Sequence, residues 1–300
     1  MSLHVIVGAG ATAHATARLL VADGERVRMV SRRGGPDEPG IERTALDATD
    51  VDALTRLAEG ADTVFNCAAT AYHTWPETVP PLFGAIRTAA ERTGAGYVML
   101  TNLYGYGPVD DGPVTEATPQ RATGPKGGTR AAMWREAKAA HDEGRVRATE
   151  VRAGQFLGAG AVSLFSIFVA PPVRAGRPAL VPTELDHPHA FTAIGDAART
   201  LVAASRNEAA WGAPWLAPTI TATMRELATR YAALAGVPVP ELGTLTDREL
   251  TLLGLTDPFW PELFETRFMD TGRFVVDAGH TERTLGVAAS PLDEVLAEMR

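Results

Sequence analysis

The first residues with evident chemistry lie in a glycine-rich segment, Gly-Ala-Gly-Ala-Thr-Ala, that begins at Gly8. This spacing between a strand and a helix is typical of dinucleotide binding. Gly8 permits the tight turn, Gly10 lets the backbone approach a pyrophosphate, and Ala13 allows helix and strand to pack closely. Ala11 and Thr12 open the helix, whose free N–H groups and dipole favour phosphate. We predict a dinucleotide site here, against the alternative of an ordinary glycine-rich turn.

Three residues at the end of the second expected strand bear on which dinucleotide binds: Ser31, Arg32 and Arg33. NAD-preferring sites usually place an acid there to accept the ribose 2′-hydroxyl. Here the acid is missing, and two guanidinium groups could hold a 2′-phosphate. We predict NADP(H), bound through Arg32 with help from Ser31 or Arg33; a solvated arginine pair is the alternative. Asp47 could receive the adenine amino group, or cap the helix expected from Val51.

Short apolar runs alternate with helical patterns through the first half of the chain. Strands are expected at 3–7, 26–30, 44–46, 62–67, 97–100 and from 149, and helices at 11–22, 51–58, 82–92 and 129–142. This alternation predicts an α/β fold, a Rossmann-type doubly wound parallel sheet with right-handed crossovers. Beyond about Gly154 the rhythm breaks up, with helical patterns at 162–169, 193–205 and 224–234. We predict a Rossmann domain over 1–155, with 191–205 returning to it, and a smaller α-rich substrate domain mainly over 156–300.

Composition excludes several other classes of protein. A hydrophobic content of 45% with 21% charged residues is ordinary for a globular enzyme. Cys67 is the only cysteine, so neither an internal disulfide nor a thiolate metal cluster is available, and no metal is expected. The net charge of −8 argues against a nucleic-acid partner. The longest apolar stretch, 162–173, is too short to span a bilayer, and no secretory signal is seen, so we expect a cytoplasmic location.

Further segments extend the opening motif in order and spacing. Asn-Cys-Ala-Ala occupies 66–69, Leu-Thr-Asn-Leu-Tyr-Gly-Tyr-Gly occupies 100–107, Val-Arg-Ala-Gly-Gln-Phe-Leu-Gly occupies 151–158, and His-Ala-Phe-Thr-Ala-Ile-Gly-Asp-Ala-Ala occupies 189–198. Over roughly residues 1–205 the chain resembles the extended and atypical short-chain dehydrogenases/reductases. The resemblance implies that Ala68 and Ala69 run along the cofactor. It also implies that the segment from Ala153 to Phe156 lies near the nicotinamide.

Catalysis in that family depends on a Ser or Thr after the fifth strand and on Tyr and Lys four residues apart on the next helix. The tyrosine, its pKa lowered by the lysine, donates a proton to the carbonyl oxygen as hydride arrives. No Tyr-x-x-x-Lys exists in this chain. Aligning residues 135–137 with the family helix places Gly128 at the tyrosine position and Ala132 at the lysine position. The serine position falls on Asn102.

Thr101, Asn102 and Tyr104 are then the catalytic candidates. Tyr104 could supply the proton from the other side of the pocket, or simply pack as an aromatic in a turn. Alternatively, the substrate brings its own acidic group and the enzyme only positions it. We expect the substrate or a bound water to deliver the proton, with these three residues orienting the carbonyl. Lys126 could reach the cofactor, but we favour an ordinary loop lysine.

The function that fits best is an NADPH-dependent ketoreductase acting on a bulky, largely apolar carbonyl compound, such as an aromatic polyketide or antibiotic intermediate. This expectation rests on a set of aromatic residues that could build a wide apolar pocket: Phe259, Trp260, Phe264, Phe268 and Phe274. They could equally form the core of the small domain. A non-catalytic NADP(H)-binding redox sensor is the alternative. A sugar-nucleotide epimerase or dehydratase is disfavoured, because that chemistry normally needs the missing tyrosine.

Overall fold

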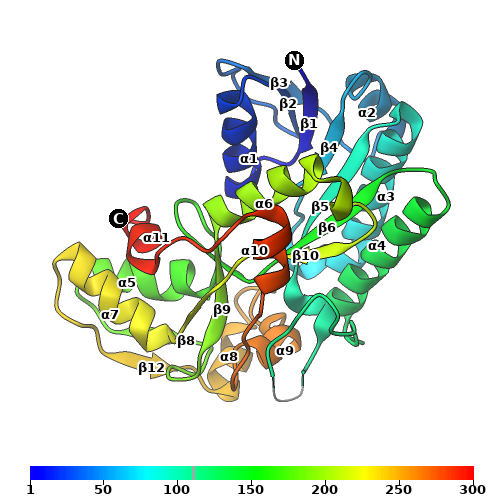
Figure 1. The fold of residues 1–300 in the computed structure, drawn as a ribbon. Helices are drawn as coiled ribbons and strands as arrows, with labels where there is room; N and C mark the ends of the chain where they lie inside the picture. The colour runs from blue at the N-terminus through cyan, green and yellow to red at the C-terminus, as the bar shows by residue number, and fades with distance from the viewer. Residues whose placement is uncertain (110–111) are drawn as a thin grey trace.

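The central feature of the molecule is a parallel sheet of seven strands (Figure 1). The structure, a computed structural model, describes residues 1–109 and 112–300. The strand order is β10-β6-β5-β4-β1-β2-β3, and neighbouring strands run parallel. The strands are β1 (Leu3–Val7), β2 (Arg26–Ser31), β3 (Ile41–Ala45), β4 (Thr63–Asn66), β5 (Gly96–Asn102), β6 (Ala148–Ala153) and β10 (Pro214–Leu216). This order confirms the predicted Rossmann-type fold.

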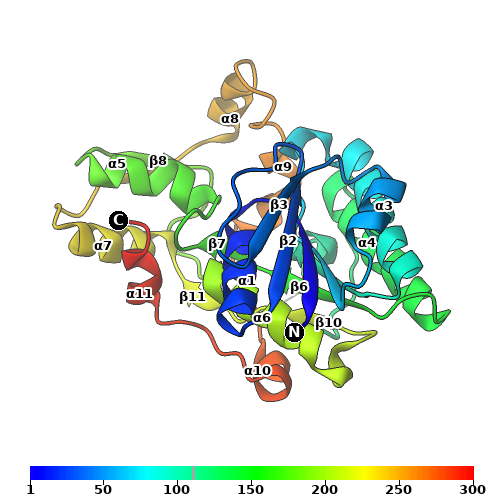
Figure 2. The same ribbon diagram turned by 90° about the horizontal axis from the view of Figure 1, so that it is seen from above.

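Helices cover both faces of the sheet, because its strands are apolar on both sides. In β1, Val5 and Val7 pack into one core cluster and Ile6 into the other. The first face carries α2 (Val51–Leu57), α3 (Trp75–Thr93) and α4 (Pro125–Asp142); the second carries α1 (Ala11–Ala22) and α6 (Ile194–Arg206). From above, α1 lies on one side of β1, β2 and β3, and α3 and α4 lie on the other (Figure 2).

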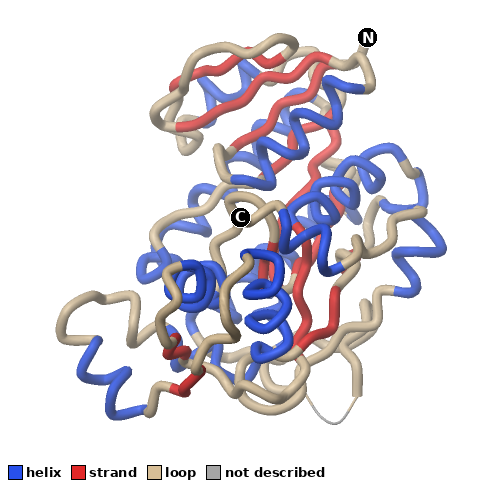
Figure 3. Tube along the Cα trace, turned by 90° about the vertical axis from the view of Figure 1, so that its left-hand side faces the viewer, coloured by secondary structure: helices blue, strands red, loops and turns tan. Residues whose placement is uncertain are grey.

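A smaller region lies beside this sheet and consists mostly of helices and loops (Figure 3). It holds a three-stranded sheet, ordered β11-β9-β7, and a two-stranded sheet, β12-β8. Its strands are β7 (Gln155–Leu157), β8 (Ala179–Val181), β9 (His189–Ala193), β11 (Ile220–Ala222) and β12 (Leu242–Thr244). Its helices are η3 (Phe165–Val169), α5 (Ala170–Arg174), α7 (Met224–Ala235), α8 (Asp247–Leu253), α9 (Leu263–Thr266), η5 (Arg267–Met269) and α11 (Leu292–Ala297). A separate core, which includes Phe165 and Tyr231, holds these elements together.

The remaining short elements are η1 (Tyr72–Thr74), η2 (Leu103–Tyr106), η4 (Glu208–Ala210) and α10 (Gly279–Leu285). Strand β10 pairs with β6, so residues 214–216 lie in the large sheet although the sequence assigns 206–300 to the substrate domain. The other domain boundaries stay a prediction. Among the described residues, none of the helices combines the length and apolar character that crossing a bilayer requires.

Two helices begin earlier than the sequence predicts, and prolines explain both differences. α3 starts at Trp75 rather than 82, and α4 starts at Pro125 rather than 129. Proline fits the first helical turn, where its missing N–H costs nothing, but it obscures a helical pattern. α3 even carries Pro80 and Pro81 inside its early turns. The third strand also starts earlier, at Ile41 instead of 44.

Candidate cofactor and substrate site

The turn between β1 and α1 has the geometry of a phosphate-binding loop. Gly8 has φ +128°, and a Cβ there would come 2.5 Å from the carbonyl oxygen of Cys67, so only glycine fits. A Cβ on Gly10 would meet nothing within 4 Å, which leaves open space in front of the helix. No side chain caps α1, so its first N–H groups are free for an anion. Thr12 and Ala13 are buried behind Ala11.

This turn lies where the strand order reverses, at the carboxyl ends of β1 and β4. Open α/β sheets bind ligands at such switch points. Ala68 and Ala69 follow β4 directly, and the Ala68 N–H donates to Oδ1 of Asn66 at 3.2 Å. Asn66 is itself anchored, because its Nδ2 donates to the Tyr97 hydroxyl at 2.8 Å. The structure therefore brings the predicted loop after Cys67 beside the glycine turn.

The end of β2 presents the expected cations. Arg32 and Arg33 are exposed, and neither forms an ion pair with the described acidic residues. The Ser31 hydroxyl donates to the Gly34 carbonyl at 3.3 Å, which shapes the loop that carries them. Arg43, which sequence reasoning missed, reaches the same edge from β3 and contacts His14 of α1 at 3.3 Å. The guanidinium groups of Arg32 and Arg33, which form no ion pair with the described acidic residues, are therefore available to a phosphate beside the switch point.

Asp47 is not the cap of α2. Asp50 caps that helix by accepting from the Ala53 N–H at 3.0 Å. The Asp47 carboxylate accepts instead from the backbone N–H and hydroxyl of Thr49, and these bonds, with help from Arg32, hold its pKa below the usual range. Asp47 is exposed beside Arg32, which leaves the adenine contact as a prediction.

Thr101, the first of the three catalytic candidates, lies in a buried polar network. It is 3% exposed and donates to the Glu150 carboxylate at 2.6 Å. Arg152 donates from Nε to the same carboxylate at 2.7 Å and from Nη1 to the Tyr106 hydroxyl at 2.7 Å. The Thr101 hydroxyl is therefore engaged by Glu150 in this structure, and its expected role in orienting a carbonyl stays a prediction.

Asn102 and Tyr104 do lie together at the end of β5. Asn102 Oδ1 accepts from the Tyr104 N–H at 3.2 Å and so caps η2. The Tyr104 hydroxyl lies 3.1 Å from that of Tyr72, which in turn lies 3.3 Å from Oγ1 of Thr266. The Tyr104 ring packs against Tyr72 and Trp75. Burial raises the pKa of Tyr104 well above 10, so its phenol stays protonated at neutral pH.

Lys126 and Arg130, four residues apart on one face of α4, lie over aromatic rings that pack against Tyr104. Lys126 is 1% exposed, and its ammonium lies 4.8 Å from the centre of the Tyr72 ring. It pairs with Glu262 and, at 3.6 Å, with Glu265. Lys126 is therefore a buried, ion-paired residue and not an ordinary loop lysine.

Arg130 is 5% exposed, and its guanidinium lies 4.2 Å from the centre of the Trp75 ring. Among the described residues, its Nε and Nη1 have no hydrogen-bond partner. Burial lowers the pKa of Arg130 to about 10, which still leaves it charged at neutral pH. A buried cation with unused N–H donors is rare in folded proteins and suggests an acceptor supplied by a ligand.

The two positions that the predicted alignment assigns to the catalytic pair lie elsewhere on α4, and the alignment itself stays a prediction. Gly128 lines a different cavity, beside Arg152 and Pro214, and Ala132 packs at the edge of the core. The α4 residues that lie over the rings packed against Tyr104 are Lys126 and Arg130, over Tyr72 and Trp75. Pro125 was the missed signal, because proline favours the first helical position and would have started the helix there.

The smaller region closes the other side of the site. Asp270 is 6% exposed, and its Oδ1 accepts from Nε2 of Gln155 at 2.6 Å. Burial raises the pKa of Asp270 to about 7, and its charge in turn raises the pKa values of Tyr72 and Tyr104. Sequence reasoning missed Asp270, since it lies over a hundred residues from its partners.

The segment after β6 passes close to the core. Ala153 is fully buried, and Phe156, half-buried on β7, packs into the cluster on the α1 and α6 face. Between them the Gly154 N–H donates to Oγ1 of Thr192 at 2.9 Å. A Cβ on Gly154 would come 2.6 Å from the Ala190 carbonyl oxygen, so the chain needs glycine here.

Only part of the predicted aromatic set reaches the site. The Phe259 ring lies 5.7 Å from the Tyr72 ring, and Trp260 lies 5.2 Å from Phe168, which extends the aromatic surface into the smaller region. Phe264 is 38% exposed, and Phe268 and Phe274 pack in a separate core cluster. Among the described residues, no group of three or more His, Cys, Asp or Glu side chains could hold a metal ion.

A family model for the NAD dependent epimerase/dehydratase family matches residues 4–214, from β1 to the start of β10. The chain belongs to this family. Its members use a nicotinamide cofactor, and the open turn at Gly10 with its free helix N-terminus fits such a group. No curated protein matches the sequence significantly.

Solved structures share the fold of this epimerase/dehydratase-family chain over nearly its whole length. MoeE5 in complex with UDP-glucuronic acid and NAD has a TM-score of 0.78 at 21% identity, covering 99% of this chain and 97% of that one. A dTDP-glucose 4,6-dehydratase, the DesIV double mutant from Streptomyces venezuelae, has a TM-score of 0.80 at 19% identity, covering 100% and 95%. The UDP-glucuronic acid 4-epimerase from Bacillus cereus has a TM-score of 0.79 at 15% identity, covering 99% and 98%.

Proposed function

We propose that this family member is an NADP(H)-dependent ketoreductase whose substrate is a bulky, largely apolar carbonyl compound, such as an aromatic polyketide intermediate. The observation that carries this proposal is a buried cation, Arg130, whose Nε and Nη1 have no partner among the described residues; it lies over the Trp75 ring, against which the protonated phenol Tyr104 also packs. Arg32, assisted by Ser31 or Arg33, binds the 2′-phosphate of the cofactor and so selects NADP(H).

The electrostatics favour reduction over oxidation. Carbonyl reduction builds negative charge on oxygen, which a fixed cation in a dry site stabilises. Oxidation of an alcohol needs a base instead, and a phenol whose pKa lies well above 10 is a poor one. The carboxylates of Glu262 and Glu265 are engaged by Lys126.

Each residue of the site then has a role. The bound cofactor supplies the hydride. Arg130 holds the developing charge on the carbonyl oxygen, while Tyr104 and Asn102 orient it. The proton comes from an acidic group of the substrate or from a bound water. Asp270, with a pKa of about 7 beside both phenols, is suited to return a proton to that water.

A second candidate is oxidoreduction of a sugar nucleotide. It is favoured by two of the solved structures that share the fold, MoeE5 in complex with UDP-glucuronic acid and NAD, and a dTDP-glucose 4,6-dehydratase. The initial oxidation in such chemistry needs a base; Tyr104 is a poor one, and the group suited to that role is Asp270, whose pKa is about 7. A non-catalytic NADP(H) sensor is the third reading, which predicts tight cofactor binding without turnover.

The test is NADPH oxidation by the whole chain with phenol-bearing aromatic ketones, compared with NAD-dependent turnover of UDP-glucose and UDP-glucuronic acid. Replacing Arg130 by Met should lower ketone turnover by about 10²- to 10³-fold, as loss of a preorganised oxyanion partner does. Arg92→Met on the exposed face of α3 is the matched control and should change nothing. Urea unfolding checks that both variants stay folded.

The outcomes separate the three candidates. Ketone turnover that is lost in Arg130→Met and kept in Arg92→Met supports the reductase. Turnover of UDP-sugars with NAD, and not of ketones, supports the second candidate. Tight NADPH binding without turnover of any carbonyl compound supports the sensor.

A further inference from the structure

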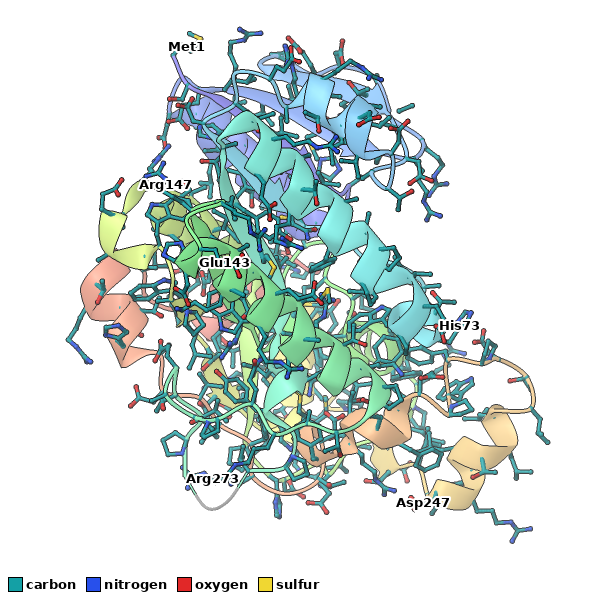
Figure 4. All side chains as sticks on the ribbon, turned by 90° about the vertical axis from the view of Figure 1, so that its right-hand side faces the viewer. Met1, His73, Glu143, Arg147, Asp247 and Arg273 are labelled. Atoms are coloured by element: carbon teal, nitrogen blue, oxygen red, sulfur yellow. The ribbon has the colours of Figure 1, made fainter. Side chains whose placement is uncertain are left out.

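A cavity of about 480 Å³ lies at the edge of the central sheet, apart from the site described above. Its walls are the first half of α4, the loop at 116–122 and the adjoining ends of β6 and β10; Figure 4 shows α4 beside α3 on this side of the molecule. Gly128 faces this cavity, whereas Arg130, two residues later, faces Trp75. The polar and aromatic side chains that line it include Glu116, Gln120, Arg121, Trp134, Arg135 and Arg152.

The floor of the cavity is a guanidinium group that is fixed in place. Arg152 is 2% exposed, and its orientation is set by two hydrogen bonds, from Nε to Glu150 and from Nη1 to the Tyr106 hydroxyl, both at 2.7 Å. Its Nη2 takes part in none of the hydrogen bonds among the described residues. A preorganised donor of this kind loses little entropy when it binds an acceptor.

The rim adds positive charge that the described protein does not neutralise. Arg121 and Arg135 form no ion pair with the acidic residues that the structure describes, and Arg135 makes only a long bond, 3.4 Å, to the Ala131 carbonyl. Glu116 also lines the cavity, and its carboxylate accepts from the Leu216 N–H at 3.4 Å and from Oγ1 of Thr281 at 3.0 Å; three guanidinium groups, from residues 121, 135 and 152, stand against this carboxylate and that of Glu150. In a chain of net charge −8, this is a local positive excess.

We propose that this cavity is a binding site for a small dianion, a phosphate group or a dicarboxylate. Arg121 and Arg135 hold it from the rim through paired N–H donors, Arg152 binds it at the floor, and the Trp134 indole forms one wall. The volume suits a small metabolite. The Tyr106 hydroxyl connects the floor to η2, two residues from Tyr104, so the dianion binds next to the element that presents the catalytic phenol.

The test titrates the whole chain with inorganic phosphate, with malonate and with chloride at matched ionic strength, by calorimetry. Saturating cofactor, NADP⁺ or NAD⁺ according to which binds, fills the phosphate sites at α1 and β2 beforehand. The double variant Arg121→Gln/Arg135→Gln should bind phosphate or malonate about 100-fold more weakly, about ten-fold for each lost charge-assisted contact. Arg174→Gln/Arg177→Gln removes the same charge from an exposed surface and should leave binding unchanged.

Binding of phosphate alone identifies a phosphate ester as the ligand class, and binding of malonate alone identifies a dicarboxylate. Equal affinity in the double variant, or heats no larger than those of chloride, would overturn the proposal. Thermal unfolding without ligand checks that both double variants fold. The test reads binding and not turnover, so its outcome is independent of whether the chain reduces ketones.

Discussion

The proposed cofactor end of the site and its proposed substrate end are built from different parts of the chain. The cofactor end is mostly backbone: a glycine with φ +128° at Gly8, an open approach at Gly10 and the free N-terminus of α1, all within a few consecutive residues. The substrate end is made of side chains from four separate segments, among them Tyr72, Tyr104, Lys126 and Asp270.

This difference decides how each end responds to mutation. A backbone site tolerates side-chain changes that keep the turn, and in the proposed function only contacts such as Arg32 tune its selectivity. A site of buried polar side chains contains groups with shifted pKa values and unused donors, so single changes there affect stability, pH dependence and chemistry together. The predictions that follow compare the two ends, from the largest expected effect to the smallest.

Asp270→Asn should change the pH dependence of stability most. The folded pKa of about 7 lies above the ordinary value of 3.8, so between those limits the folded state keeps a proton that the unfolded state loses. Stability therefore falls as pH rises through this window, by up to about 4 kcal/mol, and the loss is complete above pH 7. Asparagine cannot ionise, so the variant escapes this loss.

The measurement is urea unfolding of wild type and Asp270→Asn from pH 4 to pH 8. The unfolding free energy of the variant, relative to that of wild type, should rise steadily up to about pH 7 and then level off. Asp50→Asn, at the exposed cap of α2, is the control and should show no such gain. If the difference in unfolding free energy between variant and wild type does not vary with pH, then burial does not raise the pKa of Asp270.

Arg32→Ala tests the cofactor end. Losing a charge-assisted contact to the 2′-phosphate should weaken NADPH binding by about 1.5–3 kcal/mol and leave NADH unchanged, because NADH has no phosphate there. Fluorescence titration of both cofactors measures this, with Arg56→Ala on α2 as the control. Equal weakening of the two cofactors would show that Arg32 does not read the phosphate.

The same contrast explains what the sequence could predict. The fold follows from apolar periodicity, and the structure confirms it. The turn at Gly8 follows from a local motif, and the structure gives this glycine the positive φ of a tight turn. Arg130 and Asp270 could not be found this way, because their surroundings come from distant segments. The start of α4 was predictable in principle, because proline favours the first helical turn and Pro125 stands there.

The smallest effect should come from Tyr104→Phe. Phenylalanine keeps the ring that packs against Tyr72 and Trp75, and it removes one hydroxyl whose pKa, well above 10, is not tuned for proton donation near neutral pH. Turnover of a phenol-bearing ketone should therefore fall only a few-fold. Methylating the phenol of the substrate should lower turnover far more, about 10²- to 10⁴-fold, because that removes the acid itself.

Tyr72→Phe is the matched control, since it disturbs the same hydroxyl pair from the other side. A thousand-fold loss in Tyr104→Phe, with NADPH affinity intact and Tyr72→Phe active, would make Tyr104 the acid and end the case for substrate assistance. The methyl ether must first be shown to bind, because a substrate that no longer enters the site would mimic loss of the proton.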